Sequence, residues 1–445
     1  MLSKRSLYDI IDLVLAEAKP FDARVLVNAG TQGLTRYANS EIHQSVYEDA
    51  TEVTITITTA NKRSETKTTA YDEASLREVV RDLVQNLTFL PEGEEQPALV
   101  EGPPLIETEL WSAGLEEQYT VEKRAQLIKD CLDTLDSNHL AYGALTYSVG
   151  HLAFGNSRGI KRFARTNRVN FSALVAASAG GSGFAKITGS HPGKLDVFAA
   201  FARARQKALL NKDPIDLEPG AYTVILEPLA VSDLISYMSL IAFTGKSVQN
   251  QASFLTGKLG ERVFDPRLNL TDDYTDENTM RLPFDFEGAA RTVVDIICAG
   301  VPTGLTHDGQ SAKKAGVPTT GHSVNMPNYG GLPINLVMTP GEKSLAQIIS
   351  ESDRALLVTR FHYMNPVNPR QGLLTALTRD GFFKIEKGHI VAAVKNMRFT
   401  ESMLVALNNV VEIASDREAT PSFFANHYVP ALKLKDFHFT GKTQA

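Results

Sequence analysis

The first 213 residues carry one arrangement of elements twice, and this repeat constrains the fold more than any other feature of the sequence. The tetrapeptide Phe154-Gly155-Asn156-Ser157 echoes Tyr37-Ala38-Asn39-Ser40. In each copy an apolar-faced helix precedes the tetrapeptide, and strand-like runs and a second helix follow it, near residues 72–87 and 195–210. We therefore predict an internal duplication of a helix–strands–helix unit, over residues 1–90 and 120–213. A four-residue echo can also arise by chance, and this alternative stays open.

Local patterns support the elements of both units. Val53, Ile55 and Ile57 alternate with threonines, which is typical of an antiparallel strand that is buried on one side. Asp72 precedes one helical stripe of apolar residues and Thr120 precedes another, so we expect both to be N-caps.

Two linkers divide the chain. Residues 91–119 form an acidic, proline-rich connector, and no Lys or Arg occurs in residues 82–122, so nothing there attracts a phosphate backbone. Residues 214–220 contain two prolines and separate an N-terminal domain, 1–215, from a C-terminal domain, 220–445.

The C-terminal domain is predicted to be rich in strands. A strand at 222–226 precedes a helix that we expect Ser232 to cap. Strands at 373–377, 382–385 and 390–394 are separated by Asp380-Gly381 and Lys387-Gly388, which predicts an antiparallel meander with tight turns. Thr400 is expected to cap a last helix. The fold class is therefore α+β.

Charge and cysteine content exclude some classes of protein. The chain has 45 Lys and Arg against 51 Asp and Glu, which gives a net charge of -6 and argues against a generally basic nucleic-acid binder. Two cysteines cannot form a disulfide framework and indicate a reducing compartment, and no window approaches ~18 apolar residues. We expect a cytoplasmic protein with no membrane partner. The basic cluster divides between two faces of a strand and is interpreted as a solvated hairpin; its members are Arg158, Lys161, Arg162, Arg165 and Arg168.

Few patterns indicate catalysis. The glycine-rich residues 180–186 fit neither phosphate-loop template and are interpreted as a flexible loop between strands. No His-Glu zinc helix and no Gly-x-Ser-x-Gly elbow occurs. The best local set of metal ligands is His307, Asp308 and His322, which His362 could join, and surface turns are the ordinary alternative.

Three stretches resemble the TldD/PmbA family, formerly called modulators of DNA gyrase. They are residues 36–44, the block Ser253-Phe254-Leu255-Thr256-Gly257-Lys258-Leu259-Gly260 with its continuation to residue 273, and residues 335–341. The Ser-Phe-x-x-Gly-Lys-x-Gly block is the most specific piece. The resemblance extends to Asn408-Asn409 and covers essentially the whole chain.

The resemblance also implies what this chain lacks. TldD-like members look like zinc peptidases with a His-Glu-x-x-x-His helix upstream of the block. Counting back from Gly257 places the positions of that motif's His, Glu and second His, here called the zinc-helix slots, on Ser236, Tyr237 and Ile241. Ile241 cannot bind a metal, Ser236 is a poor zinc ligand, and Tyr237 does not replace a carboxylate base. The family's C-terminal cysteine is also missing, because no Cys follows Cys298. The chain therefore looks like the PmbA (TldE) branch, with no cofactor of its own and with zinc expected in a TldD-like partner.

In the family, both subunits enclose a chamber, and the C-terminal domain is barrel-like. The polar region 360–370 lies near the peptidase site of family members, so the resemblance implies that it contacts peptide or partner. A solvated connector is the alternative. The candidate contact residues are Arg360, His362, Tyr363, Asn365, Asn368 and Arg370.

The leading hypothesis is a non-catalytic subunit of a TldD-type zinc metallopeptidase that acts on unfolded peptides. It would form a heterodimer with a TldD-like subunit, or a homodimer when alone. One rival is a self-sufficient metallo-hydrolase homodimer that uses His307, Asp308 and His322. The other is a modulator that binds gyrase or DNA, although the acidic balance argues against a nucleic-acid partner.

Overall fold

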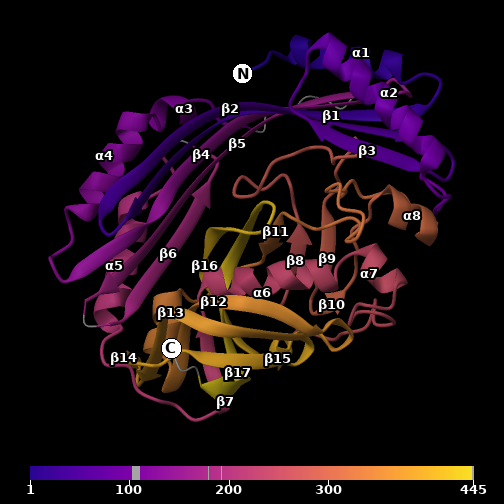
Figure 1. The fold of residues 1–445 in the computed structure, drawn as a ribbon. Helices are drawn as coiled ribbons and strands as arrows, with labels where there is room; N and C mark the ends of the chain where they lie inside the picture. The colour runs from indigo at the N-terminus through magenta and orange to yellow at the C-terminus, as the bar shows by residue number, and fades with distance from the viewer. Residues whose placement is uncertain (103–110, 179, 192, 443–445) are drawn as a thin grey trace.

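The computed structural model describes residues 1–102, 111–178, 180–191 and 193–442. The N-terminal half forms a curved sheet that arches over the C-terminal half (Figure 1). The helices of the N-terminal half lie on the outer face of this sheet, and its inner face turns toward the C-terminal half. The α+β prediction is confirmed.

The N-terminal sheet has the strand order β3-β2-β1-β4-β5-β6, and its pairs are antiparallel. Two long hairpins, β1–β2 and β4–β5, lie side by side at its centre and are joined by the pairing of β1 with β4. The echoed tetrapeptides occupy the same place in both, since each ends the first strand of a hairpin and begins its turn. The elements are α1 (Lys4–Glu17), β1 (Asp22–Ala38), β2 (Glu41–Thr58), β3 (Arg63–Thr68), α2 (Glu73–Phe89), α3 (Leu115–Gln118), α4 (Val121–Leu132), β4 (His139–Asn156), β5 (Lys161–Ala177), β6 (Ser182–Gly189) and α5 (Val197–Leu210).

Period-two alternation decides what each face of this sheet contacts. Val53, Ile55 and Ile57 are fully buried in the cluster that α1 and α2 cover. On the opposite face, Phe154 packs against Phe284 of the C-terminal half. The predicted caps are confirmed: the Ser75 N–H donates to Asp72 at 3.0 Å and the Lys123 N–H donates to Thr120 at 3.4 Å.

The C-terminal half is a large mixed sheet that closes on itself. Strand β17 pairs with both β15 and β7, so that β17, β15, β13, β12 and β7 form a barrel-like ring. Most pairs are antiparallel, and β12–β7 and β11–β17 are parallel. The strands are β7 (Gly220–Leu226), β8 (Leu270–Asp272), β9 (Val294–Cys298), β10 (Val301–Pro302), β11 (Leu336–Met338), β12 (Arg354–Asn368), β13 (Leu373–Glu386), β14 (His389–Ala393), β15 (Met397–Ser402), β16 (Val410–Pro421) and β17 (Asn426–Lys442).

Helix α6 belongs to the core of this half. It packs against β12, β16 and β17, and its mostly apolar sequence is typical of a helix that is buried all round. The helices of this half are α6 (Pro228–Ile241), α7 (Gly245–Gln249), α8 (Gly309–Ala315), α9 (Leu345–Ser350), the 3-10 helix η1 (Pro369–Gln371) and α10 (Met403–Ala406).

Several local predictions are wrong. Helix α6 begins at Pro228, whose missing N–H costs little in a first turn, so Ser232 lies inside the helix and does not cap it. Thr400 lies in β15, and the last helix is the single turn α10. The glycine-rich residues 180–186 are not a loop between strands, because residues 182–186 belong to β6 (Ser182–Gly189).

The expected turn at Asp380-Gly381 is a bulge inside β13. Both residues have positive φ, 54° and 134°, and the register with β12 shifts opposite them. Aspartate and glycine tolerate this backbone region, so the strand bends without ending. The next predicted turn, at Lys387-Gly388, does join β13 to β14.

In the part of the chain that the structure describes, no helix is long and apolar enough to cross a membrane.

Candidate functional site

The three zinc-helix slots lie on α6 and are packed into the protein. Ser236 is buried and lines a cavity of about 10 Å³ with Ser239 and His427. A cavity needs roughly 10–15 Å³ to hold one water molecule. The Tyr237 ring meets the edge of Phe423 at a centroid distance of 5.3 Å, and Ile241 belongs to the main core.

These side chains do not fit a zinc ion. None of the three slots supplies an imidazole, thiolate or carboxylate, and the space beside Ser236 is too small for a hydrated metal. Across the described ranges, no three His, Cys, Asp or Glu side chains gather closely enough to hold a metal. Core packing therefore stabilises α6 in this chain, although the helix carries none of the zinc-ligand residues of the motif.

A buried serine–histidine pair lies beside these slots. Ser232 Oγ is 3.1 Å from Nδ1 of His427, and both residues are 1% exposed. Burial lowers the pKa of His427 to about 4, so the imidazole stays neutral at physiological pH. The residue types resemble those of a hydrolase, but a substrate cannot reach them, and the pair is structural. The sequence gives no signal for it, because 195 positions separate the two residues.

Two of the segments that carry the family resemblance, at Asp272 and at Asn335, meet in another buried network. Asp272 Oδ1 lies 3.1 Å from Nε2 of His322, and its Oδ2 accepts the Asn335 N–H at 2.9 Å. Ser253, from the most specific block, donates its hydroxyl to the Ala242 carbonyl at the end of α6. Ser253 therefore fixes the loop that follows α6, and Asp272 joins the segments at His322 and Asn335.

The candidate metal ligands serve separate structural roles. His322 is bound to Asp272 and Thr320, and burial lowers its pKa. Asp308 accepts the Ser311 N–H and caps α8. The His307 ring lies against Gly245, where an added Cβ would be 2.0 Å from it.

Region 360–370 is a strand and one turn of 3-10 helix. Residues 360–368 continue β12, and bulges interrupt their pairing with β13. Tyr363 has a φ of 50° and is 70% exposed, and Asn365 and Arg370 are exposed as well. The His362 ring contacts the Tyr363 ring in a tilted arrangement at a centroid distance of 4.3 Å, and Asn368 accepts the Arg370 N–H at 3.1 Å. Among the described strands, only β13 pairs with these residues, because β7 pairs with β12 at residues 356–358.

Arg360 faces inward and links the two halves of the molecule. Its guanidinium pairs with Asp380, whose other oxygen accepts the Ser182 hydroxyl of β6 at 2.6 Å. It also lies 4.1 Å from the centroid of the Phe184 ring. Arg360 is thus a junction residue, whereas Tyr363 and Arg370 are free to meet another molecule.

Asp233 adds an ionisable group between α6 and β12. Its Oδ2 accepts the Phe361 N–H at 3.0 Å, and burial raises its pKa to about 7 although Arg360 and Lys186 oppose the rise. Burial lowers the pKa of Lys186 across from it. Asp233 is the only charged residue of α6, and this was the signal that could have singled it out from the sequence.

Four members of the basic cluster are divided between exposed side chains with partners and one buried arginine. Lys161 pairs with Asp12 at 2.6 Å and Arg158 with Asp22 at 3.2 Å, and Arg165 lies over the Trp111 ring. Arg162 is buried, so the prediction of a fully solvated hairpin is wrong. Arg158 and Lys161 are thus each paired with an aspartate, which weakens the attraction of this hairpin for a phosphate backbone.

Comparison with known proteins finds metalloproteases among the relatives of this chain. The chain is 26% identical over 220 residues to a metalloprotease TldD homolog of Haemophilus influenzae, covering 48% of this chain and 45% of the relative. It is 25% identical over 287 residues to the metalloprotease PmbA of Escherichia coli O157:H7, covering 62% and 60%. The chain thus spans about half of these relatives' own length in one case and three fifths in the other.

The fold agrees with solved structures over nearly the whole chain. TldE from Thermococcus kodakarensis superposes with a TM-score of 0.85 at 18% identity, covering 98% of this chain and 100% of that one. The model of the PmbA/TldA metallopeptidase C-terminal domain matches residues 219–441, half of the chain. This match means that the chain belongs to the PmbA/TldD metallopeptidase family.

Proposed function

We propose that this chain is a non-catalytic subunit of a TldD-type metallopeptidase that processes unfolded peptides, with the zinc held by a TldD-like partner. The observation that carries the proposal is that α6 is present but lacks zinc ligands and a catalytic base. The helix keeps its place in the core, but Ser236, Tyr237 and Ile241 offer no metal ligand and no base.

Strand β12 supplies a surface for such a role. Beyond residue 361 the strand leaves one side without a pairing strand in the described chain, and an extended peptide can add to an edge of this kind. Tyr363 on this part of β12 and Arg370 on the following η1 are exposed, and both residue types often anchor interfaces. We infer that this segment positions peptide or partner beside the partner's catalytic centre.

The experiment is reconstitution with a TldD-like partner. We expect the two chains to co-purify as a heterodimer, with neither cleaving an unfolded peptide alone and the pair cleaving it. Tyr363→Ala and Arg370→Ala should each lower turnover roughly tenfold, because an anchor of this type contributes about 1–2 kcal/mol or more.

Tyr71→Ala, at another exposed tyrosine, is the matched control and should leave turnover unchanged. Peptide cleavage by this chain alone would overturn the proposal and favour the self-sufficient hydrolase. Full turnover in both the Tyr363 and the Arg370 variant would remove the segment 360–370 from the site.

A further inference from the structure

The inner face of the N-terminal sheet carries three cations on three of its strands. Side chains alternate between the two faces of a strand, and the sequence neighbours Tyr37, Val169 and Ile187 pack under the outer helices, so the cations face inward. The three cations are Arg36 of β1, Arg168 of β5 and Lys186 of β6.

These three side chains are accessible and unpaired. None of them forms a hydrogen bond or an ion pair with a residue that the structure describes. Arg36 is exposed, whereas Arg168 and Lys186 are half-buried and their nitrogens keep accessible surface. Lys186 also lines a cavity of about 180 Å³ beside the start of α6. A ligand can therefore reach all three.

Two of the cations are partly desolvated without compensation. Burial lowers the pKa of Arg168, and no acid of the described chain opposes this change. Burial also lowers the pKa of Lys186, although Asp233 opposes the change. A desolvated cation without a paired anion costs free energy, and an anionic group of a ligand would recover part of this cost.

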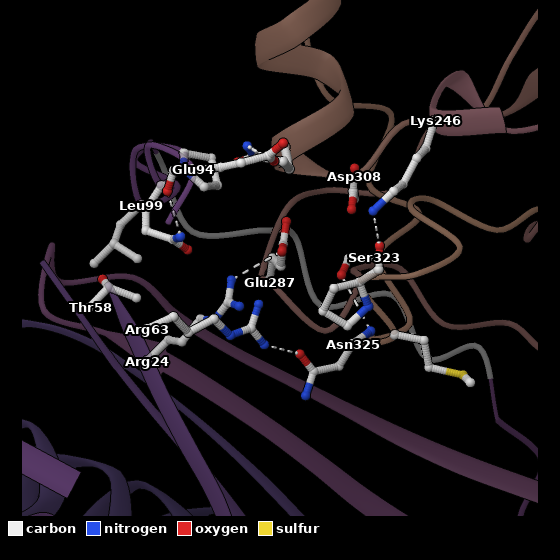
Figure 2. Close-up of a pocket in the computed structure, with 15 residues that line it drawn as sticks. Arg24, Thr58, Arg63, Glu94, Leu99, Lys246, Glu287, Asp308, Ser323 and Asn325 are labelled. Atoms are coloured by element: carbon white, nitrogen blue, oxygen red, sulfur yellow. Dashed lines mark hydrogen bonds and ion pairs between the residues drawn. The ribbon is translucent and has the colours of Figure 1, made fainter. Parts of the chain in front are cut away.

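Charged side chains at another contact between the sheet and the C-terminal half are different, because they are paired (Figure 2). Arg24 pairs with Glu287 at 3.1 Å, and Arg63 donates to Asn325 at 2.8 Å. These contacts join the two halves around a cavity of about 170 Å³. The contrast singles out the inner-face cations as groups that the fold itself leaves without partners.

The strand register spaces the cations across the sheet. Arg36 and Lys186 lie in one cross-strand row, with Ala144 and Ser172 between them. Three strand spacings of ~4.8 Å place their backbones about 14 Å apart. Arg168 lies four residues before Ser172 along β5, which places it about 13 Å from that row. Carboxylates four residues apart in an extended peptide also span about 13 Å, so the spacing suits such a chain.

Charge complementarity selects an acidic peptide as the occupant. Glu48 is an exposed acid in the cross-strand row of Arg168, and Asp380 is already paired with Arg360. Positive charge therefore prevails on this face, and it would repel a basic peptide. Three cations are few for duplex DNA, whose binding proteins often contact roughly 6–10 phosphates.

We propose that this inner face binds extended peptides rich in acidic residues, whose carboxylates pair with Arg36, Arg168 and Lys186. The inference rests on the proposed role in peptide processing and names the class of peptide. Its test measures binding by this chain alone, so a failure of zinc-dependent cleavage in the reconstituted complex is a separate result.

Fluorescence anisotropy of the full chain tests the proposal. The probe is a labelled twelve-residue glycine–serine peptide with three glutamates spaced four residues apart, and the comparison peptides carry glutamine or lysine at the same positions. We expect the glutamate peptide to saturate the chain below about 1 mM at low salt, and both comparison peptides to bind roughly tenfold more weakly or worse. Absence of saturation, or equal binding of the glutamate and glutamine peptides, would overturn the proposal. Tighter binding of a twelve-base-pair DNA duplex would overturn it in favour of a nucleic-acid partner.

Variants assign the binding to this face. Arg168→Gln and Lys186→Met should each weaken binding of the glutamate peptide roughly tenfold. The matched controls Arg262→Gln and Lys212→Met, at exposed positions away from the sheet face, should bind as the unaltered chain does. Unchanged binding in both inner-face variants would overturn the proposal.

Two further measurements separate binding from structure. Arg168→Gln should not lower the melting temperature, because Arg168 has no partner to lose. A lower melting temperature would reveal a structural role and overturn the proposal. Sedimentation of the same variants tests a second copy as the occupant: a dimer that both substitutions convert to a monomer would make this face an interface between copies and would also overturn it.

Discussion

Replacing Arg360 with alanine should destabilise the fold, although Arg360 lies on the same segment as exposed contact residues. The change leaves the Asp380 carboxylate, which is 5% exposed, with the Ser182 hydroxyl and a distant Arg379 at 3.9 Å. Breaking a buried pair from one side costs about 3–5 kcal/mol, and partial exposure of Arg360 and the nearby Arg379 reduce this to about 2–3 kcal/mol.

Equilibrium urea unfolding measures this cost. Arg370→Ala is the matched control, since an exposed arginine on the same segment should change the free energy of unfolding by about 0.5 kcal/mol or less. A double-mutant cycle with Asp380→Asn keeps the positive φ at that position tolerable and isolates the pair. If Arg360→Ala were as stable as Arg370→Ala, or if the cycle showed no coupling, Arg360 would not lock the two halves together.

Other perturbations test the buried groups around α6. Burial raises the pKa of Asp233 to about 7, so the native state holds a proton that the unfolded state releases near pH 4, and this group makes the free energy of unfolding fall as the pH rises from about 4 to 7. Asp233→Asn should flatten that part of the pH profile of the free energy of unfolding. An unchanged slope would contradict the assignment. Gly245→Ala should cost about 1–3 kcal/mol, because its Cβ would lie 2.0 Å from the His307 ring, and an unchanged melting temperature would show that the ring moves freely. Ser232→Ala leaves Nδ1 of His427 buried without its partner and should cost about 1–3 kcal/mol while turnover of the reconstituted complex stays normal; lost turnover at full stability would make the pair catalytic.

The hydrophobic periodicity of the sequence predicted strands and helices that pack against one core. Local patterns failed to predict structure that depends on contacts between segments far apart in the sequence. The alternation of Val53, Ile55 and Ile57 predicts a strand with one buried face, and the structure confirms it, since a strand's period of two leaves little choice. The turn signal at Asp380-Gly381 was misleading, because the same residue types suit a tight turn and a bulge, and only the inward Arg360 and Ser182 decide between them.

The candidate site was predictable only in part. The resemblance identified α6 and the slots on Ser236 and Tyr237 from spacing, but not that these positions are packed. The pairing of Ser232 with His427 depends on the closure of β17 onto the barrel-like ring, which no local pattern encodes. Likewise, the segment around Glu94 reads as a solvated connector, and its contact with Lys314 comes from tertiary structure.

The zinc content of the chain purified alone tests the central claim most directly. The measurement is elemental analysis after exposure to excess zinc and removal of loosely bound metal, with cleavage of an unfolded peptide followed in the same sample. Because Ser236, Tyr237 and Ile241 supply neither ligands nor a base, the account predicts zinc far below one ion per chain and no cleavage that a chelator stops. One tightly bound zinc per chain together with chelator-sensitive cleavage would contradict it.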